Sequence, residues 1–419
     1  MAKFLIHGGK KLKGEIEVKG AKNAALKAFA ASLLFQEPIV IKNVPLIEDI
    51  FRISELLEAL SVKAEKIGDR TFKISGNQAN SYVLKPEISK AIRASIVLTG
   101  PLLARFGKAI FPHPGGCVIG ERPIDIFLDA FHEMGAKVAE KDGSYVLEAE
   151  RLRGAEIVFK NISATATETL MMAAVLAKGK TILCNAACEP EIPYLANFLN
   201  VSGARISGAG THTISIIGVK NLHSKKPFIT MPDRIETGNF AVLAGLLGDN
   251  IIIKNCEPAH IMIFLKHLRL AGVNYEKGTN WLKISAPGRL QAVDIRTKEY
   301  PGFATDLQAP FTVLLTQAEG KSLVHETIFE GRLNYINDLN RMGASITICD
   351  PHRVIVEGPS SLRGRETESP DLRAGLAFVF AGLIAEGDSI IHNVYHIDRG
   401  YERIEERLQR LGADIRRIK

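Results

Sequence analysis

Two kinds of helical segment alternate along the 419-residue chain, and their apolar and polar positions tell them apart. Segments such as NAALKAFAASLLF at 23–35 and LRAGLAFVFAGLIA at 372–385 are apolar on nearly every side, which predicts buried helices. Others, such as ERIEERLQRLGA at 402–413, carry charges along one side and predict helices that face solvent. Strand-like apolar runs follow both kinds, so the pattern predicts a mixed α/β fold.

The solvent-facing segments share one turn, which marks an internal repeat. Each segment ends close to Leu-Gly-Ala and then enters a strand, and the turn residue recurs about every 70 residues. The six turn positions are Ser61, Gly135, Gly203, Gly272, Gly343 and Gly412. Glycine suits a helix C-cap in the left-handed conformation, and Ser61 is the one departure. The repeat predicts six units, each with one buried and one exposed helix.

The six units divide at the proline-bearing stretch KKPFITMPDR, residues 225–234, which lies between the third and the fourth. This predicts three units packed around a shared helical core, twice over. We expect one domain over 22–230 and a second over 231–419 together with residues 1–21. The opening strand, residues 4–18, is assigned to the second domain by symmetry alone.

Composition narrows the class of protein without deciding its function. Hydrophobic residues make up 46% and charged residues 24% of the chain, which is typical of a globular protein, and the formal charge is +7. That charge fits an anionic small molecule as well as nucleic acid. The longest apolar run, residues 375–385, is too short to span a bilayer, and the start of the chain lacks the pattern of a signal peptide. We therefore expect a cytoplasmic protein.

The five cysteines, at 117, 184, 188, 256 and 349, are odd in number and scattered. They predict free thiols in a reducing compartment and supply no zinc-binding set. Four lie in or beside apolar strands and are expected to be structural. Cys117 differs, because it lies in the glycine-rich stretch HPGGCVIGERPID at 113–125. The residues alone leave it open whether Cys117 is a reactive thiol or an accidental surface cysteine.

Polar and charged residues gather where the buried helices begin. They are Lys22, Asn23, Arg93, Ser163 to Thr167, Arg234, Glu236, Asp306, Asp371 and Arg373. Helix N-termini attract anions, so converging helix starts, joined by Arg122, Arg332 and Arg399, would suit a ligand with several phosphate or carboxylate groups. Taken alone, each Asp or Ser at such a position has a simpler role as a helix N-cap, and this holds for Asp306.

Six motifs, in order along the chain, carry a resemblance to a known family that runs from about residue 3 to residue 417. They are KGAKNAAL, GGCVIGERPID, EPEI, PDRIETG, TDLQA and YHIDRGYERIE. With these motifs the chain closely resembles the UDP-N-acetylglucosamine 1-carboxyvinyltransferases, the enolpyruvyl transferases that open bacterial peptidoglycan synthesis. The resemblance implies two inside-out α/β barrels, each of three repeated units, with the active site between them.

The reaction that the resemblance implies transfers the enolpyruvyl group of phosphoenolpyruvate to the 3-hydroxyl of UDP-N-acetylglucosamine and releases phosphate by addition and elimination. It needs no metal and no cofactor, because basic side chains hold the charge. The implied partners are these two small molecules, with no nucleic acid, no membrane and no obligate protein partner.

The resemblance also implies roles for individual residues. Cys117 is the general acid in a mobile loop, residues 112–122, and Asp306 takes the proton of the attacking hydroxyl. Lys22, Asn23, Arg122, Arg373 and Arg399 hold phosphoenolpyruvate, and Lys22 and Arg399 are counted with the catalytic residues. The implied contacts to the nucleotide sugar are Arg93, Arg122, Pro123, Ile124, Asp125, Ile126, Asn161, Ile162, Ser163, Ala164, Asp306 and Ile328.

Several positions depart from the family pattern, namely Ala164, Thr165, Tyr194, Ala304, Pro310, Gly331 and Leu333. None of them removes a side chain with an implied catalytic role, so they bear on nucleotide contacts and rate. Three alternatives remain: a 5-enolpyruvylshikimate-3-phosphate synthase, which lacks the cysteine-bearing loop, an RNA-binding or RNA-processing repeat protein, and a catalytically silent paralogue. Aromatic residues are only 7%, with one tryptophan, so the chain offers few stacking platforms for RNA.

Overall fold

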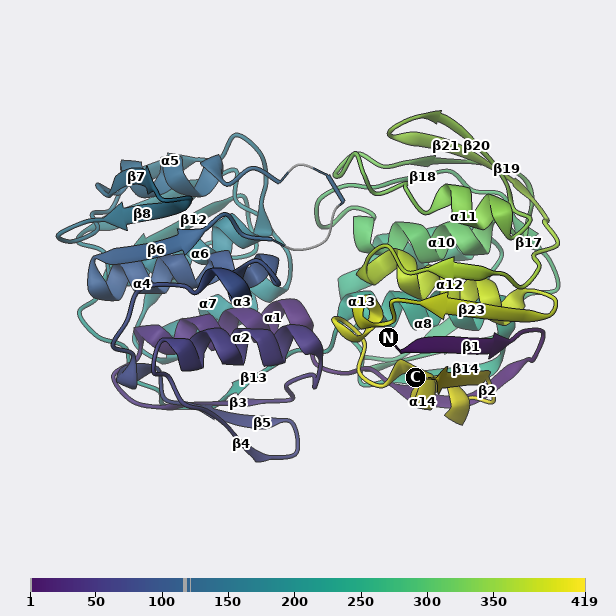
Figure 1. Cartoon of the computed structure of the whole chain (residues 1–419), viewed down its shortest axis with the longest axis horizontal. Coiled ribbons are helices and arrows are strands. Elements are labelled where there is room, and N and C mark those ends of the chain that lie inside the picture. Colours follow the sequence, from purple (N-terminus) through teal and green to yellow (C-terminus); the bar gives the residue numbers. More distant parts are fainter. Residues whose placement is uncertain (1, 116–118, 121, 419) are drawn as a thin grey trace. The chain divides into compact units, whose positions relative to one another are not determined.

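The computed structural model describes residues 2–115, 119–120 and 122–418, so Cys117 lies outside the described residues. The chain forms two compact units, drawn in sequence colours in Figure 1. The N-terminal unit holds residues 20–115 and 122–231. The C-terminal unit holds residues 2–19, 119–120 and 232–418.

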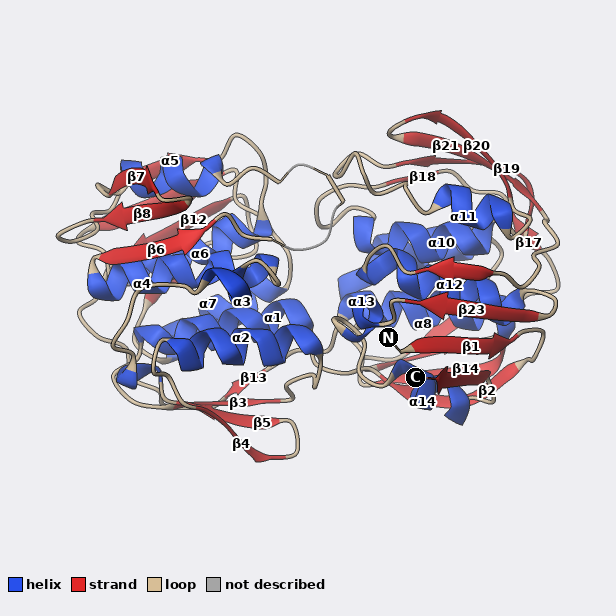
Figure 2. Ribbon diagram, in the orientation of Figure 1, coloured by secondary structure: helices blue, strands red, loops and turns tan. Residues whose placement is uncertain are grey.

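Helices form the centre of the N-terminal unit, and strands lie outside them (Figure 2). The inner helices are α1 (Lys22–Ala31), the 3-10 helix η3 (Arg93–Leu98) that leads into α4 (Thr99–Phe106), and α6 (Ala164–Val175). The helices α2 (Glu48–Ala59), α5 (Asp125–Glu133) and α7 (Glu191–Val201) pack against this inner set. Short helical turns are η1 (Ser32–Leu34), η2 (Gly76–Gln78) and α3 (Pro86–Ser89).

The described part of the N-terminal unit has three sheets. Their strand orders are β13 (Phe228–Ile229), β3 (Ile39–Lys42), β5 (Thr71–Ile74), β4 (Ala64–Gly68); then β6 (Lys108–Pro112), β8 (Ser144–Glu148), β7 (Lys137–Lys141); then β11 (Arg205–Ser207), β12 (Thr213–Ile217), β10 (Lys180–Cys184), β9 (Glu156–Val158). In each sheet, the strand that follows an inner helix has an antiparallel neighbour on one side and a parallel neighbour on the other. In the second sheet, the parallel neighbour of β6 is a single bridge between Val83 and Ile110.

The C-terminal unit repeats this plan. Its inner helices are α8 (Arg234–Leu247), η5 (Thr305–Leu307) with α10 (Gln308–Leu315), and α12 (Leu372–Ile384), which pack against one another. Further helices are η4 (Pro258–Ile261), α9 (Met262–Leu270), α11 (Ile336–Arg341), α13 (Tyr395–Asp398) and α14 (Ile404–Arg410).

The described sheets of the C-terminal unit are also three. Their orders are β15 (Tyr275–Lys277), β16 (Trp281–Ile284), β14 (Gly248–Lys254), β2 (Leu12–Glu17); then β17 (Leu290–Gln291), β19 (Ala318–His325), β21 (Arg353–Gly358), β20 (Ser345–Asp350), with β18 (Ile295–Arg296) also on β19; then β22 (Glu366–Glu368), β23 (Asp388–His392), β1 (Lys3–His7), β24 (Asp414–Ile418). The opening strands β1 and β2 therefore complete two sheets of this unit.

The burial of the two helix classes follows their sequence patterns, so that prediction is confirmed. In α12 every residue from Leu372 to Leu383 is buried, and in α6 the same holds from Ala166 to Val175. By contrast, α9 buries only Phe264, Leu265 and Leu268. Helices inside and sheets outside, in three repeats per unit, give each unit the inside-out α/β barrel fold that we predicted.

One buried polar contact joins two inner helices of the N-terminal unit. The Lys27 ammonium of α1 lies 2.9 Å from the Glu168 carboxylate of α6, and the two side chains are 7% and 1% exposed. Burial raises the pKa of Glu168 to about 7, although the charge of Lys27 works against that shift. The contact therefore ties folding of this core to pH.

The repeated turns have the predicted backbone conformation at all six positions. Gly135, Gly203, Gly272, Gly343 and Gly412 have positive φ between 90° and 110°, and Ser61 shares this conformation with φ 67°. A second set of left-handed residues ends the strands that follow inner helices, at Asn43, Asn185, Asn255 and Asn393. At Ser61 packing imposes the helix-end turn although the residue is not glycine, because the helix must stop and reverse there.

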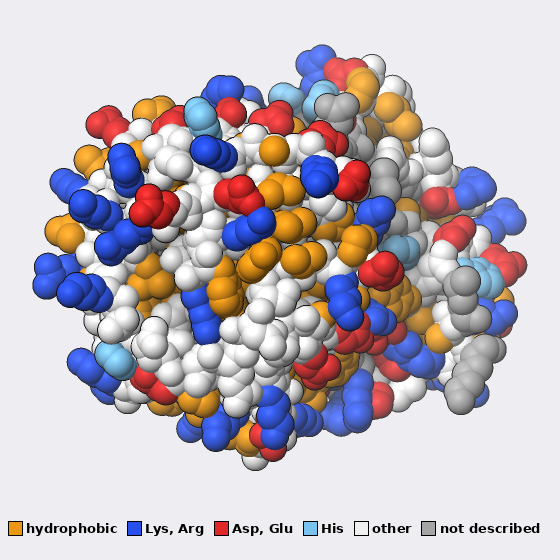
Figure 3. Space-filling view, turned by 60° about the vertical axis from the view of Figure 1, so that its left-hand side comes forward, with side chains coloured by type: hydrophobic (Ala, Val, Ile, Leu, Met, Phe, Trp, Pro, Cys, Tyr) orange, Lys and Arg blue, Asp and Glu red, His pale blue; other side chains and the backbone are white. Residues whose placement is uncertain are grey.

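Figure 3 shows basic side chains mixed with acidic ones over the face that it presents. Among the helices that the structure describes, none is both long enough and apolar enough to cross a bilayer.

Candidate functional site

The predicted residues of the N-terminal unit begin at its inner helix α1. Lys22 is the first residue of α1, and its ammonium lies 3.0 Å from the buried carboxylate of Asp49 in α2. The Lys22 side chain is 12% exposed, so the ion pair holds it in one place while its tip still reaches solvent. Asn23 follows it and is half-buried. This geometry fixes a cation at the start of an inner helix, where an anion is favoured.

Arg93 and Arg122 form a second cationic group in the same unit. One guanidinium nitrogen of Arg93, the first residue of η3, donates to the carbonyl of Pro114 at 3.1 Å, and another donates to the carbonyl of Arg122. Burial, followed by the charge of Arg122, lowers the pKa of Arg93 to about 10. Two guanidinium groups that disfavour each other's charge would be stabilised by a bound anion.

The remaining predicted residues of this unit lie at the starts of α5 and α6. Ile124 is buried and Ile126 half-buried, whereas Pro123 and Asp125 are exposed. Helix α5 packs against α6 and β9, so this segment and residues 161–164 lie on neighbouring elements. In the second segment Asn161 is exposed, and Ile162, Ser163 and Ala164 are half-buried. Ser163 is the N-cap of α6, and its hydroxyl accepts from the Ala166 N–H at 3.2 Å.

In the C-terminal unit, Asp306 is the centre of a charged cluster. Its two carboxylate oxygens accept from Arg332 at 2.8 Å and from Arg373 at 3.0 Å. Both arginine side chains are only 5% exposed, whereas that of Asp306 is 24% exposed. The carboxylate is thus held by two buried guanidinium groups and still faces outward.

The simpler alternative for Asp306, a helix N-cap, does not hold in the structure. Asp306 lies inside the 3-10 helix η5, whose N-cap is Ala304, and that cap makes no side-chain hydrogen bond. The capping role predicted for such positions does hold for Asp371, whose carboxylate accepts from first-turn N–H groups of α12, and Asp233 caps α8 in the same way. Asp306 departs from that pattern because the two arginines bind its carboxylate.

A buried tyrosine holds Arg373 from its other side. A second guanidinium nitrogen of Arg373 donates to the Tyr401 hydroxyl at 2.8 Å, and the Asn239 amide nitrogen of α8 donates to the same hydroxyl at 2.5 Å. Burial alone would lower the pKa of Arg373, but the charge of Asp306 and the contact with Tyr401 raise it above its ordinary value. Arg373 is therefore a permanent cation at this site.

Arg399 directly follows α13 and is 6% exposed. Burial and then the positive charge of Arg399 lower the pKa of His396, which favours the neutral imidazole beside the arginine.

Ile328, the last predicted nucleotide contact, lies in the loop after β19. Its N–H donates to the Glu326 carboxylate at 2.8 Å.

Sequence reasoning missed Glu326, which organises this side of the site. Its fully buried carboxylate also accepts from the hydroxyls of Thr297 at 3.0 Å and Thr305 at 2.8 Å. It therefore joins the residue before Asp306 to the loop that carries Ile328. A signal was available, because Glu326 ends the run SLVHE where four other copies of the repeat end in asparagine. Tyr401 and Asn239 gave no comparable signal.

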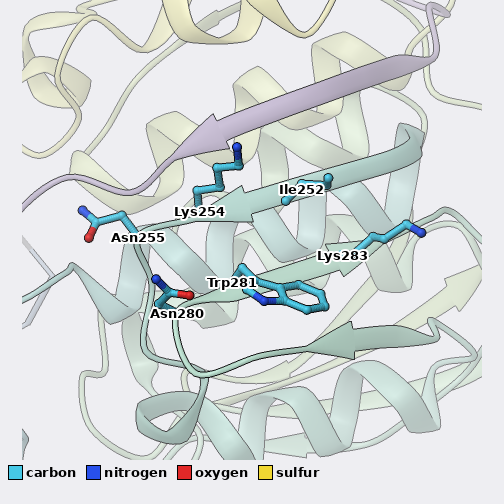
Figure 4. Close-up of a pocket in the computed structure, with 6 residues that line it drawn as sticks. All are labelled: Ile252, Lys254, Asn255, Asn280, Trp281 and Lys283. Atoms are coloured by element: carbon cyan, nitrogen blue, oxygen red, sulfur yellow. The ribbon is translucent and has the colours of Figure 1, made fainter.

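Two hollows elsewhere in the C-terminal unit are not lined by predicted site residues. One, of about 400 Å³, lies on the outer face of the sheet around Trp281 (Figure 4). Its lysines are paired, Lys254 with Glu15 and Lys283 with Glu276. The other, of about 570 Å³, is polar and includes His392.

Across the residues that the structure describes, no cluster of three His, Cys, Asp or Glu side chains could hold a metal ion.

One departure from the family pattern has a visible structural setting. The N–H of Gly331 donates to the carbonyl of Ile119 at 3.0 Å. A Cβ at position 331 would come within 2.8 Å of the Ile119 backbone, so a side chain here would displace residue 119. Leu333, the neighbouring departure, is buried in the core of the unit.

Comparisons with known proteins agree with the resemblance drawn from the motifs. The family model described as EPSP synthase (3-phosphoshikimate 1-carboxyvinyltransferase) matches residues 6–408. The chain is 44% identical over 419 residues to the UDP-N-acetylglucosamine 1-carboxyvinyltransferase of Thermodesulfovibrio yellowstonii, covering all of both chains. It is 46% identical over 423 residues to the protein of that name from Magnetococcus marinus, again covering all of both.

Solved structures show the same fold. The enolpyruvyl transferase NikO from Streptomyces tendae superposes with a TM-score of 0.90 at 25% identity, over 99% of this chain and 98% of that one. EPSP synthase from Acinetobacter baumannii shares the fold, with a TM-score of 0.76 at 19% identity over the whole of both chains. The chain therefore belongs to the EPSP synthase family and, within it, to the UDP-N-acetylglucosamine 1-carboxyvinyltransferases.

Proposed function

We propose that this chain is an enzyme that transfers the enolpyruvyl group of phosphoenolpyruvate to the 3-hydroxyl of UDP-N-acetylglucosamine and releases phosphate. This is the first committed step of peptidoglycan synthesis, and we place it in the cytoplasm, the compartment predicted from the thiols. The observation that carries the proposal is the 44% identity, over all 419 residues, to a protein with that name. The charged clusters supply the chemistry.

Phosphoenolpyruvate carries a phosphate and a carboxylate, so its site must hold several negative charges. We propose that Lys22, Asn23 and Arg122 of the N-terminal unit and Arg373 and Arg399 of the C-terminal unit bind it together. The burial of Arg373 and Arg399 supports this, because a guanidinium held in a dry setting binds an oxyanion more strongly than one in water. The same groups would stabilise the negative charge of the phosphate as it leaves.

Proton transfer needs one acid and one base. We propose that the Cys117 thiol donates a proton to the methylene carbon of phosphoenolpyruvate while the sugar hydroxyl attacks the adjacent carbon. Asp306 would take the proton of that hydroxyl, and the fixed position of its carboxylate between Arg332 and Arg373 supports the assignment. Phosphate then leaves from the tetrahedral adduct while the Cys117 thiolate takes a proton back from the newly formed methyl group, and the carbon–carbon double bond of the enol ether forms again. Each step uses side chains alone.

The nucleotide sugar needs a second, longer site. We propose that Arg93, Arg122 to Ile126, Asn161 to Ala164 and Ile328 contribute to it. The neighbouring positions of α5 and α6 support a shared role for the first two segments. The departures at Ala164, Thr165 and Gly331 introduce no charged side chain, so we expect them to affect the shape of this site rather than its charge.

Release of inorganic phosphate from phosphoenolpyruvate, measured with each of two acceptors, tests the proposal. We expect release with UDP-N-acetylglucosamine and none with shikimate 3-phosphate. Release with shikimate 3-phosphate alone would assign the chain to the sister activity. No release with either acceptor, from a folded protein, would make it a silent paralogue.

A further inference from the structure

A buried tyrosine links the predicted catalytic groups of the C-terminal unit. The Tyr401 side chain is among the largest fully buried ones of the described chain, at 1% exposed. Its hydroxyl accepts from Arg373 at 2.8 Å and from Asn239 at 2.5 Å. Burial raises the pKa of Tyr401 above its ordinary value, so the phenol stays neutral. It acts as a neutral acceptor for a buried cation.

The hydroxyl determines the direction of the Arg373 guanidinium. One terminal nitrogen of that group donates to Tyr401, and the other donates to the Asp306 carboxylate. The guanidinium is planar and rigid, so holding one nitrogen aims the other. The Arg373 Nε atom has no hydrogen-bond partner in the described residues, so these two hydrogen bonds, together with the Tyr401 ring whose centroid lies 5.6 Å from the guanidinium carbon, orient the group.

Tyr401 also anchors the segment that carries Arg399. Its own N–H donates to the carbonyl of Ile397 at 3.0 Å, and the intervening Gly400 packs so closely that a Cβ there would lie 2.2 Å from Leu372. Arg399 therefore lies two residues from a phenol that is bonded to the side chain of Arg373. The hydroxyl of Tyr401 therefore contacts one predicted phosphoenolpyruvate-binding arginine, which also binds the predicted base, and the backbone of Tyr401 lies two residues from the second arginine.

We propose that Tyr401 is a positioning residue for the transfer reaction: its hydroxyl aligns Arg373 with Asp306, and Asn239 holds the phenol in place. This inference rests on the proposed function. Without the hydroxyl, Arg373 can swing away from Asp306. Small displacements of this kind slow an oriented reaction by about a hundredfold.

The test is Tyr401→Phe, with Tyr335→Phe as the matched control. Tyr335 is also 1% exposed in the same unit, and its hydroxyl accepts from Gln308 at 2.9 Å rather than from an arginine. For Tyr401→Phe we expect kcat to fall about ten- to a hundredfold, KM for phosphoenolpyruvate to rise a few-fold, and KM for UDP-N-acetylglucosamine to stay within about threefold. For Tyr335→Phe we expect kcat within about threefold of wild type.

The inference is overturned if Tyr401→Phe keeps kcat within about threefold of wild type, or if the two variants lose kcat equally. If Tyr401→Phe does not fold, Asn239→Ala replaces it. This variant keeps the phenol and removes its second partner, so a kcat loss of about three- to tenfold supports the inference and an unchanged kcat refutes it. Each kcat and KM is expressed as a ratio to the value for the wild-type enzyme. Wild-type turnover with shikimate 3-phosphate would instead reject the proposed function, and the same ratios could then be measured with that acceptor.

Discussion

Replacing Asp306 with asparagine separates two contributions of one carboxylate. The change keeps the size of the side chain and removes its charge. One amide oxygen can still accept from one arginine, but the amide NH₂ group then faces the other. We therefore expect Asp306→Asn to destabilise the C-terminal unit as well as to remove the proposed base.

The structure sets the size of the stability effect. Removing one partner of a fully buried ion pair costs about 3–5 kcal/mol. The Asp306 side chain is 24% exposed and the arginines at 2.8 and 3.0 Å keep other contacts, so part of that cost is screened. We expect a loss of about 2–3 kcal/mol, which for a unit of this size lowers Tm by about 4–12 °C. Loss of a general base lowers turnover by about 10²–10⁴-fold.

The assay measures melting, phosphate release and UDP-N-acetylglucosamine binding on one preparation, at a temperature where the variant is folded. Asp371→Asn is the control for stability, because Asp371 caps α12 through two N–H groups and asparagine caps about as well. Its free energy of unfolding should be within about 0.5 kcal/mol of that of wild type. If Asp306→Asn melts like wild type and turns over within a few-fold of it, the reasoning about this cluster is wrong.

Three further results are expected. Lys27→Met should lower the free energy of unfolding by up to about 3 kcal/mol at pH 8 and by much less at pH 5. The pKa of Glu168 is about 7 in the fold and ordinarily 4.5, so the wild type loses stability as pH rises across that interval, and removal of the ammonium would deepen the loss. Urea unfolding at the two pH values checks this, and an equal cost at both contradicts it. A phosphonate epoxide such as fosfomycin should label Cys117 and spare the exposed Cys349 by mass spectrometry, and labelling spread over both would reject the assignment. Glu326→Gln should weaken UDP-N-acetylglucosamine binding about tenfold by calorimetry, since four donors lose a charged acceptor, whereas unchanged affinity would mean that this loop does not contact the ligand.

The pattern of apolar and polar residues along the chain was sufficient to predict the repeat and the burial of its helices. Apolar positions on every side of α12 and on one side of α9 decide burial directly, because a helix with no polar face must be covered. The glycine turns were likewise visible, because the left-handed conformation suits that residue. Ser61 shows the limit of the rule, since the fold imposes the conformation there on a residue with a side chain.

The contacts that organise the candidate site could not be predicted from local pattern. Asp306 is 26 residues from Arg332 and 67 from Arg373, and Asn239 is 162 from Tyr401. Spacing along a helix or strand says nothing about partners at such separations. For this reason the simplest role of Asp306, an N-cap, does not hold, and its partners became evident only in the structure, where α12 brings Arg373 and the turn before α11 brings Arg332 to its carboxylate.

The central claim is that an enolpyruvyl group moves to the sugar nucleotide. Phosphoenolpyruvate labelled with ¹³C in its three carbons, incubated with UDP-N-acetylglucosamine and the purified chain, tests this directly by NMR. The account predicts that the labelled carbons appear as a vinyl ether on the 3-oxygen of the sugar, in step with phosphate release. Phosphate release with the label recovered as free pyruvate, or no change in either substrate, would contradict it.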